Sequence, residues 1–139
     1  MLGTAIEADI MIAFVLASDP GQVGMTRCLV RAALEYRRLG RYASEAEIIT
    51  SELVTNAIQH AGGADPNSMI GVTLMRVWDR EAISVVVTDS SPVPPVKRET
   101  TTRSERGRGL QIVEALSVHW GWNRERGGKA VYAILTKEG

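Results

Sequence analysis

The sequence has a single cysteine and no long apolar run, and both shortages limit what the protein can be. With Cys28 alone, the chain cannot form an internal disulfide bond, which is typical of a reducing compartment. The longest apolar run, Ile10 to Ala17, has eight residues, whereas a membrane-spanning helix needs about 20. The first residues also lack the basic segment that begins a signal peptide. We therefore expect a cytoplasmic protein without a membrane span.

The sequence also has no net charge and lacks the motifs of zinc sites and serine hydrolases. Its 16 basic residues balance its 16 acidic ones, whereas diffuse binding of nucleic acid needs a basic excess. We therefore expect no direct contact with nucleic acid. One cysteine and two histidines without an H-x-x-H spacing predict no zinc site. The absence of a nucleophile elbow argues against a serine hydrolase.

The length and the order of the predicted elements indicate one domain over residues 1–139. Short turns between predicted strands favour a mixed or antiparallel sheet. Three helices suffice to cover one face of it, which gives a two-layer α/β sandwich. The predicted strands are 10–17, 70–78, 82–88, 118–122 and 130–135, and the predicted helices are 25–39, 44–61 and 110–116.

Two features of the N-terminal part predict how it packs. The apolar run 10–17 lies between a charged residue and a turn, which predicts a buried strand. After it, apolar residues recur at spacings of three and four, so we expect this stripe of the first helix to face the core. The stripe comprises Met25, Leu29, Ala32, Tyr36 and Leu39, and Cys28 is expected to pack beside it.

The second helix carries three polar residues on one side. At about 100° per residue, Glu52, Asn56 and His60 spread over only ~80° of the helix circumference, and the last two fall within its apolar arc. A half-buried amide or imidazole costs free energy unless it finds a partner. This placement therefore needs an explanation, and two are open.

The functional explanation is phosphoryl transfer. That reaction needs Mg²⁺ held by oxygen ligands beside the phosphates, and a carboxylate that orients or deprotonates the nucleophile. An Asn carbonyl oxygen and a Glu carboxylate one turn apart can serve both purposes. The structural explanation is an amphipathic helix with a solvated Glu52 and a hydrogen-bonded Asn56.

Asp89 ends the hydrophobic strand and opens a long polar loop. A carboxylate at this point can accept a hydrogen bond from an exocyclic amine such as that of adenine. It can also cap its own backbone in a turn, which is the favoured reading for this residue taken alone. The loop over 90–106 has 17 residues, and loops of this length in a compact domain tend to be functional.

A glycine-rich segment follows this loop at the start of the third helix. Glycines let backbone N–H groups approach a phosphate, and a helix N-terminus favours anions. Neighbouring arginines add charge that can neutralise a triphosphate. The spacing fits neither a P-loop nor a Rossmann fingerprint. The segment is Arg106-Gly107-Arg108-Gly109-Leu110, with Arg103 shortly before it.

Together these motifs resemble those of the GHKL ATPase family, which includes gyrase, Hsp90, histidine kinases and anti-sigma kinases. The segment from Glu52 to His60 looks like the N box, Asp89 like the aspartate of the G1 box, and 107–110 like the G2 box. The helix sequence SELVTNAIQHA, the turn over 89–92 and the stretch GRGLQIVEALSVHWGW are especially similar to small single-domain actinobacterial proteins related to anti-sigma-factor serine kinases. The resemblance covers residues 10–136.

The resemblance implies a fold and a set of roles. The fold is of the Bergerat type, a mixed sheet covered on one face by three helices, with ATP between the helices and a lid over 91–108. In it Asn56 ligates Mg²⁺, Glu52 is the general base toward a protein serine, and Asp89 binds the adenine amine. The other residues implied to contact ATP are His60, Arg106, Gly107, Arg108, Gly109 and Leu110.

The implied function is that of an anti-sigma factor and protein serine kinase. Its implied partners are a sigma factor and a STAS-type antagonist, and its implied assembly is a homodimer. The alternative is a regulatory module of the same fold that binds a sigma factor or another regulator without phosphoryl transfer. Two departures from the family pattern favour it: Asp89 is followed by Ser90, Ser91 and Pro92 instead of glycines, and Ala130 stands where relatives usually carry a threonine. The catalytic domain of a histidine kinase is disfavoured, because we see no upstream dimerisation helix with a phosphorylatable histidine.

Overall fold

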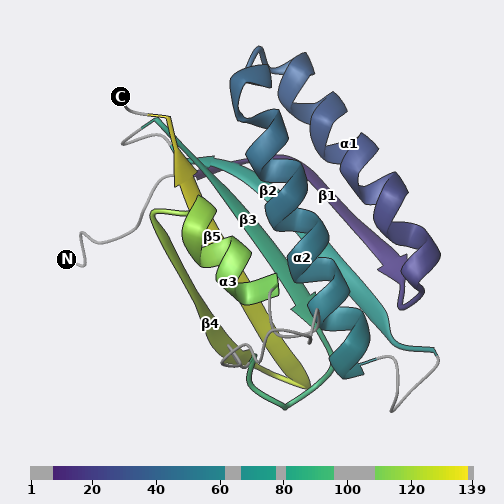
Figure 1. Cartoon of the computed structure of the whole chain (residues 1–139). Helices are drawn as coiled ribbons and strands as arrows, with labels where there is room; N and C mark the ends of the chain where they lie inside the picture. Colours follow the sequence, from purple (N-terminus) through teal and green to yellow (C-terminus); the bar gives the residue numbers. More distant parts are fainter. Residues whose placement is uncertain (1–7, 62–66, 78–80, 96–108, 138–139) are drawn as a thin grey trace.

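The computed structural model describes residues 8–61, 67–77, 81–95 and 109–137 (Figure 1). The order of strands and helices is the predicted one, and the two-layer α/β fold class is confirmed. Within these ranges no helix is both long and apolar enough to span a membrane. The elements are β1 (Ala8–Ala17), α1 (Val23–Tyr36), α2 (Ala43–Ala61), β2 (Met69–Val77), β3 (Ala82–Asp89), α3 (Gly109–Leu116), β4 (His119–Glu125), β5 (Gly128–Thr136), and the short 3-10 turns η1 (Pro20–Gln22) and η2 (Gly40–Tyr42).

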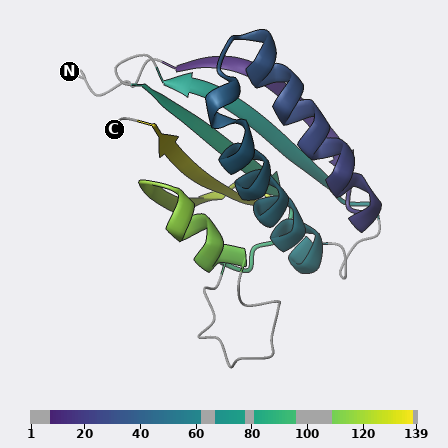
Figure 2. The same cartoon turned by 45° about the horizontal axis from the view of Figure 1, so that its top comes forward.

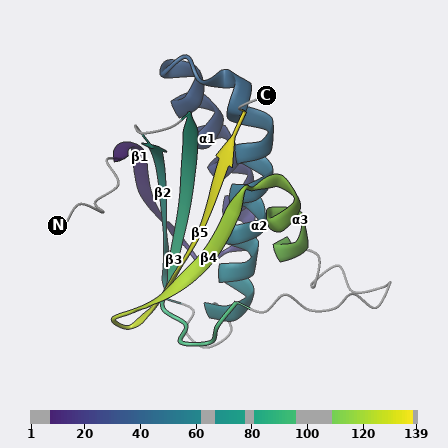
Figure 3. The ribbon, with the colours of Figure 1, turned by 90° about the vertical axis from the view of Figure 1, so that its left-hand side faces the viewer.

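The sheet has five strands in the order β1-β2-β3-β5-β4. The resemblance implied a mixed sheet, but all four pairings are antiparallel, as the short turns favour. The three α-helices lie together on one face (Figure 3). Of these, α2 is central, with α1 on one side and α3 on the other (Figure 2).

The core forms where α2 lies on the middle strands. Successive residues of a strand point to opposite faces, so Ile83, Val85 and Val87 of β3 all turn toward the helices and are buried. Asp89 is the next member of this row. From the helix side, Ile49, Leu53 and Ala57 are buried against the sheet, among other residues of the same core.

The prediction of a buried strand over 10–17 is wrong, and the stripe predicted for the first helix is buried only at Leu39, which is 3% exposed, and in part at Leu29. Strand β1 is an edge strand that pairs only with β2, so only Leu16 is fully buried and Val15 is 64% exposed.

On α1 the buried residues are Thr26, Val30 and Leu34, whereas Cys28, Met25 and Tyr36 are exposed, Tyr36 by 87%. The predicted stripe and the observed stripe of Thr26, Val30 and Leu34 are both apolar enough to pack against the sheet. The observed one can include Thr26, because its hydroxyl donates to the backbone oxygen of Gln22 (3.0 Å) and is thereby satisfied.

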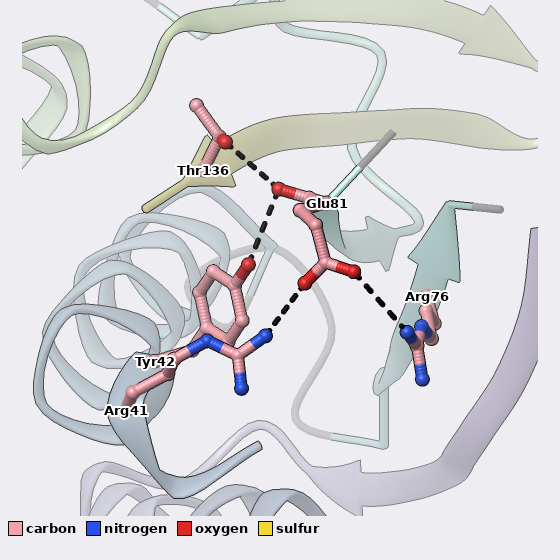
Figure 4. Close-up of polar contacts among 5 residues, drawn as sticks. All are labelled: Arg41, Tyr42, Arg76, Glu81 and Thr136. Carbon is pink, nitrogen blue, oxygen red and sulfur yellow. Dashed lines mark hydrogen bonds and ion pairs between the residues drawn. The ribbon is translucent and has the colours of Figure 1, made fainter. Parts of the chain in front are cut away.

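A polar cluster around Glu81 fixes the start of α2 to one end of the sheet (Figure 4). The Glu81 carboxylate pairs with Arg41 (2.6 Å) and with Arg76 (3.5 Å). Its backbone oxygen accepts hydrogen bonds from the hydroxyls of Tyr42 (3.2 Å) and Thr136 (2.8 Å). Because Glu81 precedes β3 and Asp89 ends it, this cluster lies at the opposite end of the strand from Asp89.

Candidate functional site

The central helix α2 places Glu52 and Asn56 one turn apart, both partly exposed and flanked by the buried Leu53 and Ala57. The Asn56 side chain makes no hydrogen bond to a described residue. Its partly exposed amide is therefore available to solvent or to a ligand. His60 is partly exposed in the last turn of the same helix.

Glu52 and Gly109 meet across the interface of α2 and α3. A Cβ atom built on Gly109 would lie 2.9 Å from Glu52 Oε2, so the carboxylate occupies the space that a side chain at 109 would need. Burial raises the pKa of Glu52 above its ordinary value of 4.5, because desolvation disfavours the charged form. A raised pKa makes this carboxylate a stronger base, as a proton acceptor in catalysis requires.

The glycine-rich segment is described only from Gly109 onward. Arg103, Arg106, Gly107 and Arg108, with the rest of the implied lid from residue 96, lie outside the described residues. Leu110 is 2% exposed and belongs to the core. Its side chain therefore packs in the core at the start of α3 instead of facing a ligand.

Asp89 is both a turn residue and the partner of a buried cation. Its Oδ1 atom accepts hydrogen bonds from the backbone N–H of Ser91 (2.8 Å) and from Lys129 Nζ (3.0 Å). The turn-capping reading of Asp89 is thus confirmed for this oxygen. The second oxygen, Oδ2, makes no hydrogen bond to any residue that the structure describes. Oδ2 is therefore an unused acceptor on a side chain that is 1% exposed.

Sequence reasoning missed Lys129. The residue is the cross-strand partner of Asp89, and it continues the row of Val131, Ala133 and Leu135 that faces the helices. The side chains of Lys129 and Asp89 are 0% and 1% exposed. The signal in the sequence was a lysine that opens an otherwise apolar alternating row.

The same alternation corrects the expectation for Ala130. This residue pairs with Thr88, and both belong to the row that turns away from the helices. A hydroxyl at position 130 would therefore point to the uncovered face of the sheet. The missing threonine says nothing against a ligand site, because the residue of β5 that faces the helices is Lys129.

An open depression of 420 Å³ lies at this end of the sheet, between Met69, Thr88 and the β4–β5 turn. Asp89 and Lys129 also border it. However, the strand alternation turns Met69, Thr88 and Glu125 toward the uncovered face. Glu52 and Asn56 belong to the covered face, so we do not place the ligand of the candidate site in this depression.

The side-chain oxygens on the helix-covered side of the sheet are suitable ligands for Mg²⁺ bound to a nucleotide. Mg²⁺ that is bound with phosphates needs only one or two protein oxygens, and Asn56 and Glu52 carry such oxygens one turn apart. Within the described residues, no group of three or more His, Cys, Asp or Glu side chains could hold a metal. Asp89 adds an acceptor and Lys129 a donor on the neighbouring strands.

Comparisons with known proteins show the family and the fold of this chain. The family model described as a histidine kinase-like ATPase domain matches residues 16–135. No curated protein matches the sequence. Among solved structures, the chain is similar to the histidine kinase domain of a blue-light activated histidine kinase from Erythrobacter litoralis EL346, with a TM-score of 0.53 and 17% identity. The match covers 86% of this chain and 61% of that one, and at this identity it shows the fold alone.

Proposed function

Because this chain belongs to the histidine kinase-like ATPase family, we propose that it binds Mg-ATP between α2, α3 and the sheet. One observation carries the proposal: the carboxylate of Glu52 lies against Gly109 at the start of α3. Glu52 and Asn56 lie on α2, and Asp89 ends β3 on the face of the sheet that the helices cover. The three proposed ligand-binding groups are therefore on the same side of the sheet.

Each residue has a proposed task in this site. The Asn56 side-chain oxygen would hold Mg²⁺, and the free Oδ2 of Asp89 would accept from the adenine amine. The metal would neutralise phosphate charge. His60 and the arginines of 106–108 are proposed to contribute on the phosphate side, the arginines by charge.

We propose that the chemical step is phosphoryl transfer to a protein serine. The serine oxygen forms a bond to the γ-phosphorus of ATP, and the bond to the bridging oxygen breaks with its electron pair leaving on ADP. Glu52 takes the proton of the serine hydroxyl. Its half-buried position supports this role, because burial raises the pKa of the Glu52 carboxyl.

The proposed biological setting is an anti-sigma factor that phosphorylates a STAS-type antagonist, acting as a homodimer in the cytoplasm. The support is the resemblance of residues 51–61, 89–92 and 107–122 to proteins of that branch.

A direct test incubates the protein with γ-labelled ATP and a STAS-domain substrate. Glu52→Ala should bind nucleotide but transfer no label, whereas Gln59→Ala, exposed on the same helix, should behave like the wild type. Full transfer by Glu52→Ala would mean that another base acts.

The second candidate function is a regulatory module that binds a protein partner without transferring phosphate. The residues after Asp89 favour it, because Ser90, Ser91 and Pro92 stand where the family's G1 box carries glycines. This candidate predicts no ATP binding by the wild-type protein at millimolar nucleotide. The two candidates are therefore separated by one binding titration.

A further inference from the structure

We propose that Lys129 is a second base-reading residue of the nucleotide site. In this proposal, its ammonium donates a hydrogen bond to the adenine ring nitrogen next to the amine that Asp89 accepts. The inference rests on the proposed ATP-binding function and names a specificity determinant within it.

The first support is position. Lys129 and Asp89 are directly opposite each other on β5 and β3, at the ends of the two rows that face the helices. The Nζ and Oδ1 atoms are 3.0 Å apart. A ligand amine that reaches Asp89 would therefore meet the ammonium of Lys129 beside it.

The second support is the count of hydrogen-bonding groups. An ammonium has three N–H donors, and among the described residues only Asp89 Oδ1 accepts from Lys129. The Lys129 side chain is 0% exposed, and a buried charge is costly unless its donors are satisfied. Oδ2 of Asp89 is similarly without a hydrogen bond to a described residue. The pair thus presents an unused donor beside an unused acceptor.

The third support is complementarity to the base. The amine of adenine is flanked by ring nitrogens that accept hydrogen bonds, N1 on one side and N7 on the other. An acceptor and a donor side by side read this edge, as the amide of Asn or Gln does when it contacts N6 and N7 in DNA. Asp89 and Lys129 supply the same combination from two strands.

A purely structural ion pair makes a different prediction. It would join β3 to β5 and would not depend on any ring nitrogen of a bound base. The decisive experiment therefore changes the ligand and leaves the protein intact. The wild-type protein is titrated by calorimetry with ATP, 1-deaza-ATP, 7-deaza-ATP and 3-deaza-ATP, all with Mg²⁺.

We expect binding to weaken about tenfold when one nitrogen beside the amine is removed, because a hydrogen bond to a charged group is lost. The 1-deaza and 7-deaza analogues distinguish which nitrogen Lys129 contacts. The 3-deaza analogue is the control, since N3 is not next to the amine. If all three analogues bind as well as ATP, the inference is wrong and the proposed function stands. If ATP itself does not bind, the proposed function fails and the inference fails with it.

A variant adds a second readout. In Lys129→Met the weakening caused by the deaza analogue should disappear, whereas Lys137→Met, on an exposed lysine that pairs with Glu45, should retain it. Persistence of the same penalty in folded Lys129→Met would assign the contact to another residue and overturn the inference. Should Lys129→Met fail to fold, Lys129→Gln is titrated in its place, and the wild-type series still overturns the inference if no analogue weakens binding.

Discussion

Gly109, the first residue of α3, lies against the carboxylate of Glu52, so that a Cβ atom at 109 would come within 2.9 Å of Glu52 Oε2. Fifty-six residues separate the two in the sequence, and the contact exists only because α3 packs beside α2. The proposed base is thereby placed at the start of the helix that follows the implied lid. A change of one methyl group at 109 tests whether this placement matters.

Gly109→Ala should leave the fold intact and slow phosphoryl transfer. The added methyl group displaces the carboxylate of Glu52, and a misplacement of about 1 Å can cost roughly a hundredfold in rate. Stability should hold or rise slightly, because Ala favours a helix over Gly by up to about 1 kcal/mol. The measurement is the single-turnover transfer rate beside the melting temperature.

The matched control is Gly24→Ala in α1, where an added Cβ meets nothing within 4 Å. It should gain the same helix propensity with no change in transfer rate. Equal transfer rates for the two variants would show that the Glu52 carboxylate tolerates displacement, and would count against its role as the base.

Glu52→Gln should stabilise the protein at neutral pH while abolishing transfer. Burial raises the pKa of Glu52 in the folded state above the ordinary 4.5, so its favourable contribution is complete below that value and is lost as the pH rises through the folded pKa. At pH 7 the ionised carboxylate therefore costs stability, which the neutral amide avoids. We expect a melting temperature up to about 2 °C higher at pH 7.

Near pH 4 this gain should vanish, because the protonated acid and the amide are then both neutral. Thermal melts of both proteins at the two pH values check the sign. A gain of the same size at both values, or a loss at pH 7, would exclude desolvation of Glu52 as the cause.

The ion pair of Asp89 and Lys129 should show strong coupling in stability. Lys129→Met leaves a buried carboxylate without its cation and should cost about 3–5 kcal/mol. Asp89→Leu leaves a buried ammonium and should cost a similar amount. The double variant removes both charges, so its cost should be far below the sum, as measured by urea unfolding. Additive costs would mean that the two groups are not paired in solution.

At the end of the sheet opposite Asp89, Tyr42→Phe should lower the stability of the protein without changing its nucleotide affinity. The variant removes the hydroxyl that donates to the backbone oxygen of Glu81 (3.2 Å), which contributes about 1 kcal/mol. Tyr36→Phe is the control, because Tyr36 is 87% exposed. If Tyr42→Phe also weakened ATP binding, the two ends of the sheet would be energetically coupled, contrary to the separation described above.

The order of elements and the fold class could be predicted because the patterns of α2, β2 and β3 are strong and local. The packing face of α1 could not. Two stripes of that helix are apolar enough to be buried, and the choice of Val30 and Leu34 over Met25 and Tyr36 depends on contacts with distant elements. The edge position of β1 depends in the same way on which strands pair.

Part of the candidate site was also predictable. Glu52 and Asn56 stand out because polar residues on an apolar helix face need a reason. Lys129 could not be found in this way, since its significance depends on the register that sets it opposite Asp89, 40 residues earlier. Position 130 was wrongly expected to face the ligand for the same reason, because a one-residue difference in a strand changes the face.

Calorimetric titration with ATP, with and without Mg²⁺, shows whether Asn56 holds Mg²⁺ in an ATP site. We predict that the wild-type protein binds ATP in a Mg²⁺-dependent manner, and that Asn56→Ala loses this binding while Gln59→Ala keeps it. Melting temperatures of the three proteins should agree closely. Absence of binding to the wild-type protein would exclude the ATP site, and unchanged affinity in Asn56→Ala would exclude the metal role of Asn56.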